Sequence, residues 1–374
     1  MPTICAGSTP PTPSGWPTSP AFVSTEVKVS TRSFRKVRAM TFLARSAAAA
    51  SAFALTLGLA PAASSQAPAP PQLSLPIACE PGRTCELQHN VDRDPGPGAR
   101  DYRCQSKTYD THTGVDIRVP DMAAQRRGVA VLAAAPGKVL RVRADQPDRV
   151  VGQGGLNPHD PVGLGNVVVL DHGGGWITAY GHMAAGSVTL KPGEMVRRGQ
   201  VLGKVGMSGL TEFPHVHMEV RLGGKVVDPF APDMSNPASC AAQAGLWDAP
   251  TAQKLTYKAG AILNAGFTAA QPSMVDVENA TIQPFNAGSP WLIVYVRAIG
   301  LLPGDEREIV LRGPDGAVLA EGRQPALARW RAQDLHVVGR RRPPAGWARG
   351  TYVAEYRVLR GGKVALSRRL ETRL

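Results

Sequence analysis

Short apolar runs of strand length, separated by glycine-containing turns, dominate the 374-residue sequence. Between residues 104 and 232 these runs are rich in Val, Leu and Ile, and none has the length and period of an amphipathic helix. The runs are Val129–Ala135, Gly137–Val142, Asn166–Asp171, Trp176–Tyr180, Gln200–Val205 and His215–Leu222. We therefore expect a compact all-β domain over residues 104–232.

The same pattern returns after a mixed segment at residues 233–271, which we expect to be a linker. Between residues 272 and 374, short alternating runs are separated by turns such as PGDE and GPDG. Many short strands over such a length are typical of an immunoglobulin-like β-sandwich. The Pro- and Gly-rich residues 68–103 predict a loop-rich lead-in. The predicted fold class is all-β, with a β-sheet domain followed by a β-sandwich.

Residues 40–67 have the pattern of a secretory signal: a basic start, an apolar run at 46–60 and a small-residue cleavage site ending at Ala67. Translation starts at Met1 or at Met40, and residues 1–39 are an unstructured or mis-called extension. An uncleaved membrane anchor is disfavoured because the apolar run is short and interrupted by polar residues. The pattern predicts export to the periplasm or the cell surface, without stable membrane insertion after cleavage.

The net positive charge of the chain indicates which partners it attracts. Cleavage after Ala67 would remove six basic residues and one acidic residue, which lowers the formal net charge from +13 to +8. A basic exported protein is attracted to polyanions, including cell-wall polymers. Nucleic acid is not an expected partner, because no recognisable binding motif accompanies the charge. The oligomeric state is left open.

Four cysteines remain after residue 67, since Cys5 lies in the segment that is removed. An even number in an exported protein favours two disulfides. Three pairings are possible, and the spacing of the cysteines does not favour a zinc cluster. We prefer the pairing that ties the start of the 104–232 domain to its end, namely Cys79 with Cys85 and Cys104 with Cys240.

The histidines indicate a metal site. His215 and His217 lie two residues apart on a predicted strand, so their side chains project from the same face. His112 and Asp116 supply another imidazole and a carboxylate around Gly114, which allows a tight local path. Catalytic zinc sites use three nitrogen or oxygen ligands and a water. The helical HExxH motif is absent, so such a site must be built on strands and loops.

Three motifs in this order resemble the LytM/lysostaphin-type zinc endopeptidases of peptidoglycan. They are HTGVD at 112–116, YGH at 180–182 and FPHVHMEVR at 213–221. The resemblance covers roughly residues 104–232. It implies a β-sheet scaffold with an open groove, which the long loop predicted at 144–165 would flank.

The resemblance also implies the role of each site residue. It implies a Zn²⁺ cofactor with three ligands: His112, Asp116 and His217. It implies that His182 and His215 are catalytic without binding zinc, and it leaves open which of the two is the general base. The implied reaction is hydrolysis of peptide bonds in the stems or crosslinks of peptidoglycan.

Two other functions compete with this hydrolase. One is a non-catalytic wall-binding regulator that activates other cell-wall hydrolases. It is disfavoured because such relatives lose one or more zinc ligands, whereas this sequence keeps all three ligands and both auxiliary histidines. The other function is binding to the wall or to a protein, through the C-terminal sandwich as a binding module.

Several further residues have weaker signals. A tyrosine upstream of the first histidine assists the transition state in some members of the family, and either Tyr102 or Tyr109 would serve. Glu219 either orients an imidazole or is a plain strand carboxylate. We expect His172 in a turn or in the core. The remaining histidines are expected to face solvent: His89, His159 and His336.

Overall fold

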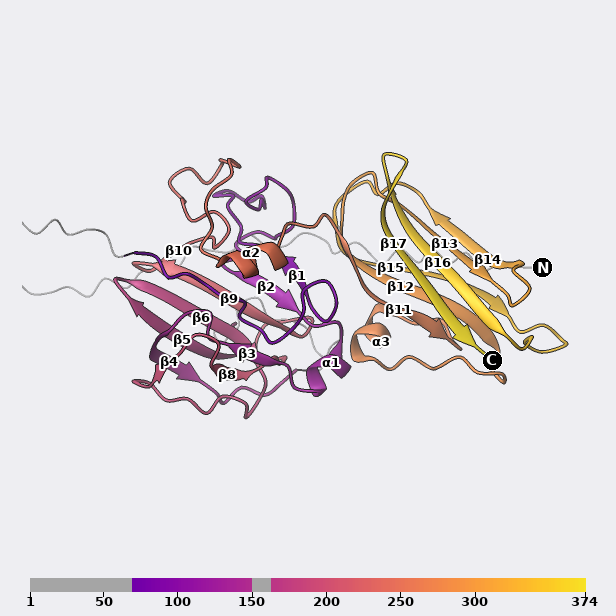
Figure 1. Cartoon of the computed structure of the whole chain (residues 1–374), viewed down its shortest axis with the longest axis horizontal. Coiled ribbons are helices and arrows are strands. Elements are labelled where there is room, and N and C mark those ends of the chain that lie inside the picture. Colours follow the sequence, from indigo (N-terminus) through magenta and orange to yellow (C-terminus); the bar gives the residue numbers. More distant parts are fainter. Residues whose placement is uncertain (1–68, 150–162) are drawn as a thin grey trace, which may run out of the picture. The chain divides into compact units, whose positions relative to one another are not determined.

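The computed structural model describes residues 69–149 and 163–374, which belong to one compact unit (Figure 1). The predicted signal sequence at residues 40–67, both candidate starts and His159 lie outside the described residues. None of the helices in the described ranges has the length and apolar character needed to cross a membrane. Most of the regular structure is strand, so the predicted all-β fold class is confirmed.

Within the described residues, an antiparallel sheet of eight strands forms the scaffold of the first β domain (Figure 1). Its strands lie in the order β1-β2-β9-β6-β5-β4-β7, and β10 pairs with β9. A separate ribbon pairs β3 with β8, and the short helix α1 (Met122–Arg126) follows β2. The strand bounds are β1 Glu86–His89, β2 Val115–Arg118, β3 Ala130–Leu132, β4 Gly137–Arg143, β5 Asn166–Gly173, β6 Trp176–Met183, β7 Met195–Val196, β8 Val201–Lys204, β9 His215–Leu222 and β10 Lys225–Val226.

Alternate side chains of strand β9 face the hydrophobic core and the candidate site. Val216, Met218 and Val220 are buried in the hydrophobic core of the first domain. Successive side chains of a strand point to opposite faces of the sheet. His215 and His217 therefore project together from the face opposite these apolar residues.

The lead-in segment packs against the first domain. Leu73 and Ile77 are buried in the same core as the sheet. The short strand β1 pairs antiparallel with β2 at the edge of the sheet. Residues before 104 thus supply both core contacts and a strand next to the HTGVD segment.

Two disulfides are present among the described residues, Cys79–Cys85 and Cys104–Cys240. This is the preferred pairing of the three that the sequence allows. The second bond ties the residues just before the sheet to the segment that follows it, as expected.

The C-terminal residues form a two-sheet antiparallel sandwich (Figure 1). One sheet has the order β11-β12-β15, and the other has the order β14-β13-β16-β17. The apolar sides of both sheets share a core. Strand β11 lies in the segment 233–271, which also contains helix α2 (Ala249–Lys254). The strand bounds are β11 Ala261–Thr268, β12 Trp291–Leu301, β13 Glu306–Arg312, β14 Val318–Gln324, β15 Arg331–Arg341, β16 Thr351–Arg360 and β17 Lys363–Arg373.

A buried carboxylate connects the sandwich to strand β2. Glu278, in helix α3 (Met274–Asn279), accepts hydrogen bonds from Arg118 Nη2 at 2.7 and 2.8 Å. Arg297 of β12 donates to the same carboxylate and to the carbonyl oxygen of Pro120. All three charged side chains are buried, so each guanidinium depends on the carboxylate for its neutralisation.

Candidate metal centre

Three neighbouring strands bring the predicted site residues together. Strands β2 and β9 pair so that Asp116 lies opposite His217. Strands β6 and β9 pair so that Gly181 also lies opposite His217, which places His182 at the next position. His112 precedes β2 by a short turn. The antiparallel register therefore gathers residues that are about a hundred positions apart in the sequence.

Three donor atoms lie close enough to share one ion. The Asp116 Oδ1 atom is 2.8 Å from His217 Nδ1 and 3.1 Å from His112 Nε2. The two imidazole nitrogens are 3.2 Å apart. Two ligand atoms that each lie about 2.0–2.1 Å from a tetrahedral zinc are separated by roughly 3.3 Å. The spacing of this group, with its two imidazoles and one carboxylate, therefore fits zinc.

The proton state of these groups also suits a cation. The His112 Nδ1 atom lies 2.6 Å from the carbonyl oxygen of Asn90, which only accepts, so Nδ1 carries the proton and Nε2 has a free lone pair. Burial alone would raise the pKa of Asp116, but His112 and His215 outweigh it and hold the pKa well below its usual value. The carboxylate is therefore ionised where it faces the imidazoles.

His182 and His215 stand beside this group with fixed tautomers. The His182 Nδ1 atom is 2.8 Å from the carbonyl oxygen of Ser208, and His215 Nδ1 is 2.9 Å from that of Phe213. Both Nδ1 atoms must donate, which leaves Nε2 as the basic nitrogen of each ring, and that of His215 lies 3.3 Å from Asp116 Oδ1. Their ring centroids are 4.6 Å apart. His182, His215 and His217 also form a second group of possible ligands that shares His217 with the first.

His182 has a strained backbone and a perturbed pKa. Its φ of 57° is in the left-handed region, which non-glycine residues occupy at a cost. Backbone hydrogen bonds on both sides, to Leu164 O and from Gly206 N, hold it there. Burial and the neighbouring His215 and His217 lower the pKa of His182 well below its usual value. The ring is therefore neutral at physiological pH.

The structure corrects two histidine predictions. His89 and His336 were expected to face solvent, but both side chains are buried. His89 ends strand β1 opposite Asp116, and its Nδ1 atom is 3.0 Å from Asp116 Oδ2. Sequence reasoning missed it because β1 is only four residues long and lies in a Pro- and Gly-rich segment. His336 lies in the sandwich, on strand β15.

Other residues near the site resolve alternatives left open by the sequence. The Tyr109 ring lies 4.4 Å from the His112 ring, whereas Tyr102 stacks on Phe230. Tyr109 is therefore the tyrosine that lies beside the candidate metal centre. His172, which was expected in a turn or in the core, instead lies in strand β5 with intermediate burial and hydrogen-bonds the Pro136 carbonyl oxygen and the Thr178 hydroxyl.

Glu219 lies beside the outer nitrogen of His217. Its Oε1 accepts a hydrogen bond from the Thr113 hydroxyl and lies 3.5 Å from His217 Nε2. That distance is at the limit of a hydrogen bond, so the contact with His217 is electrostatic. Burial works to lower the pKa of His217, but Asp116 and Glu219 outweigh it and raise the pKa to about 9.

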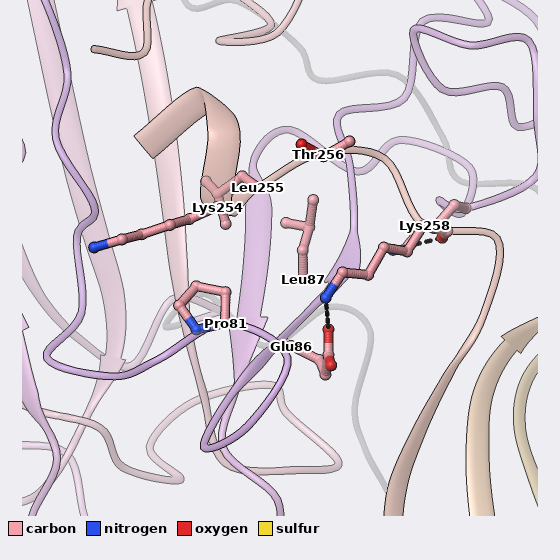
Figure 2. Close-up of a pocket in the computed structure, with 8 residues that line it drawn as sticks. Pro81, Glu86, Leu87, Lys254, Leu255, Thr256 and Lys258 are labelled. Atoms are coloured by element: carbon pink, nitrogen blue, oxygen red, sulfur yellow. Dashed lines mark hydrogen bonds and ion pairs between the residues drawn. The ribbon is translucent and has the colours of Figure 1, made fainter. Parts of the chain in front are cut away.

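A small pocket elsewhere in the first domain lacks the chemistry of the metal centre. Figure 2 shows the ion pair inside it, in which Lys258 Nζ lies 3.7 Å from Glu86 Oε2. Its lining includes Leu87 and Leu255 but none of the clustered histidines. The paired charges neutralise each other, so this pocket offers no ligand set for a metal.

Comparison with known proteins finds a family match over the region that contains most of the candidate metal centre. Residues 110–229 match Peptidase family M23. The cell division protein DipM of Caulobacter vibrioides is 29% identical over 125 residues, which are 33% of this chain and 17% of the relative. The peptidoglycan DD-endopeptidase ShyA of Vibrio cholerae is 38% identical over 123 residues, which are 33% of this chain and 23% of the relative.

A solved structure is similar to part of this chain. The catalytic domain of the prophage-encoded M23 protein EnpA from Enterococcus faecalis is 28% identical, with a TM-score of 0.28, and the match covers 41% of this chain and 94% of that domain. The chain spans about a quarter or less of the length of the curated relatives it matches. Over residues 110–229 the chain is similar to Peptidase family M23, which confirms the resemblance to the LytM/lysostaphin-type endopeptidases.

Proposed function

We propose that the protein is a zinc-dependent endopeptidase that hydrolyses peptide bonds in the stems or crosslinks of peptidoglycan. The convergence of His112, Asp116 and His217, with two further histidines beside them, carries the proposal. A peptidoglycan DD-endopeptidase among the relatives supports the substrate class. The basic charge of the chain supports attraction to an anionic wall.

The proposed ligands are His112 through Nε2, Asp116 through Oδ1 and His217 through Nδ1. When bound, zinc would supply Lewis acidity toward the scissile carbonyl and lower the pKa of a water. The carboxylate and two imidazoles match the ligand types of catalytic zinc, and His217, whose pKa is raised to about 9, would release a proton when zinc binds. Glu219, beside the outer nitrogen of His217, would hold that imidazole in its orientation.

His182 and His215 would transfer protons during hydrolysis. Each ring donates its Nδ1 proton to a backbone carbonyl and therefore presents a basic Nε2. One imidazole would accept a proton at Nε2 from the attacking water; the other, once it is protonated at Nε2, would donate that proton to the leaving amine or stabilise the oxyanion. The adjacent rings thus divide general-base and general-acid work between them.

Export follows from the same proposal. Peptidoglycan lies outside the cytoplasm, and residues 40–67 have the pattern of a signal sequence. The proposed location is the periplasm or the cell surface. The competing regulator would bind the wall without cleaving it, so turnover separates the two functions.

Digestion of purified peptidoglycan tests the proposal. The protein is incubated with wall fragments, with and without a zinc chelator, and the products are identified by mass. We expect cleaved peptides that disappear with the chelator and return on adding zinc. Wall binding without any cleaved product, in a zinc-loaded protein, would support the regulator instead.

A further inference from the structure

We propose that His89 is a positioning residue that holds the ligand Asp116. Strand β1, which lies outside the residues that match the family, would then be part of the metal centre. This inference rests on the proposed zinc site and adds a residue to it. His89 would act through Asp116, because it belongs to neither group of possible ligands found among the described residues.

The strand pairing explains how His89 reaches the site. Strands β1 and β2 are antiparallel, and a bulge between Leu87 and His89 sets His89 opposite Asp116. The His89 Nδ1 atom lies 3.0 Å from Asp116 Oδ2, and the two residues are only 6% and 2% exposed. An ionised carboxylate only accepts hydrogen bonds, so His89 Nδ1 must donate.

Because of this hydrogen bond, the two carboxylate oxygens of Asp116 have different partners. Oδ2 is occupied by His89, whereas Oδ1 faces His112 and His217 at 3.1 and 2.8 Å. A carboxylate fixed at one oxygen presents the other in a defined direction. Partners of this kind orient metal ligands and tune their affinity.

The His89 ring is itself held in place by aromatic neighbours. Its centroid lies 5.2 Å from that of Tyr109, 6.0 Å from that of Phe213 and 6.3 Å from that of Trp330. These distances are typical of packed aromatic pairs. The imidazole therefore has a fixed plane from which to donate to Asp116.

The next residue of the chain, Asn90, supports the other ligand of the HTGVD motif, His112. The Asn90 carbonyl oxygen accepts hydrogen bonds from His112 Nδ1 at 2.6 Å and from the Thr108 hydroxyl at 2.7 Å. His89 and Asn90 thus contact Asp116 and His112 respectively. Two consecutive residues at the end of β1 orient two of the three proposed ligands.

A pair of near-isosteric variants tests the role of His89. His89→Asn can place an amide nitrogen near the position of Nδ1, whereas His89→Gln places it one bond further away. We measure zinc affinity by competition with a chromophoric chelator, and we record the visible spectrum of the cobalt-substituted protein. We expect His89→Gln to lose about 10–100-fold in zinc affinity and to alter the cobalt spectrum, and His89→Asn to lose much less.

Controls separate positioning from folding. His336 is another buried histidine, so His336→Gln repeats the same exchange away from the metal and should leave zinc affinity unchanged. If His89→Gln does not fold, His89→Ala, which only removes atoms, should show the same loss of affinity.

The outcomes distinguish this inference from the proposed function. A parent protein that binds no zinc would overturn the proposed function and this inference with it. A parent that binds zinc, with His89→Gln and His89→Ala binding equally tightly, would overturn the role of His89 alone.

Discussion

At the scale of single residues, the site depends on which nitrogen of each imidazole carries the proton. Backbone carbonyls of Asn90, Ser208 and Phe213 each accept from an Nδ1 atom. The Nε2 atoms of His112, His182 and His215 are thereby left as bases. The three motifs predicted which residues meet. The carbonyl partners of His112 and His182 lie 22 and 26 positions away, so no local pattern encodes those two tautomers, whereas Phe213 is only two residues before His215.

His89 shows the limit of residue-level prediction more clearly. A histidine between a glutamine and an asparagine, in a Pro- and Gly-rich segment, has no local mark of burial. Its environment comes from the pairing of β1 with β2, a contact between residues far apart in sequence. Only the structure reveals it.

His336 gives a stability prediction that depends on pH. Burial, and secondarily Arg307, lower the pKa of His336 to about 4. The unfolded chain then binds more protons than the folded chain between about pH 6.5 and 4, so stability is full above this window and falls as the pH drops through it. The loss amounts to about 3 kcal/mol at its end.

The variant His336→Leu should remove this loss. Chemical denaturation of both proteins at pH 7.5 and pH 4.5 measures the difference in the free energy of unfolding. We expect the variant to lose less stability than the parent between these pH values. An equal loss in both proteins would show that His336 does not titrate in this way.

At the scale of elements, alternation along the strands predicted most of the sheet. The predicted run His215–Leu222 is strand β9, and the predicted runs Asn166–Asp171 and Trp176–Tyr180 lie within β5 and β6. Strand β11 was not predicted, because Asn264 and Gly266 interrupt its apolar pattern. Tertiary pairing with β12 overrides that weak local signal.

Gly114 tests the close approach between the HTGVD segment and β9. A Cβ atom at Gly114 would lie 2.6 Å from His217 Nε2 and from the carbonyl oxygen of Met218. The variant Gly114→Ala must therefore push the segment away from β9. We expect a stability loss of about 1–3 kcal/mol and weaker zinc binding, measured by denaturation and chelator competition.

The matched control is Gly96→Ala. The nearest atom to a Cβ atom there is a carboxylate oxygen of Asp94 at 3.4 Å, at the end of a side chain that can move. This exchange should leave zinc affinity unchanged. Parental zinc affinity in Gly114→Ala would argue against the tight packing of the two segments.

At the scale of the whole molecule, Glu278 connects the sandwich with the strand that carries Asp116. The variant Glu278→Gln would leave the buried guanidinium groups of Arg118 and Arg297 without a counter-charge. We expect a destabilisation of about 3–5 kcal/mol in chemical denaturation. The partly exposed Glu355 also contacts two arginines, and Glu355→Gln should cost less than about 1 kcal/mol. Equal small losses in both variants would show that this connection does not stabilise the protein.

The central claim is that one zinc ion is held by His112, Asp116 and His217. Its most direct test is the zinc content of the purified protein, set beside its hydrolysis of peptidoglycan, for the parent, His217→Ala and His182→Ala. We expect one zinc per chain in the parent, neither zinc nor hydrolysis in His217→Ala, and zinc without hydrolysis in His182→Ala. Hydrolysis by a zinc-free, folded His217→Ala protein would contradict the account.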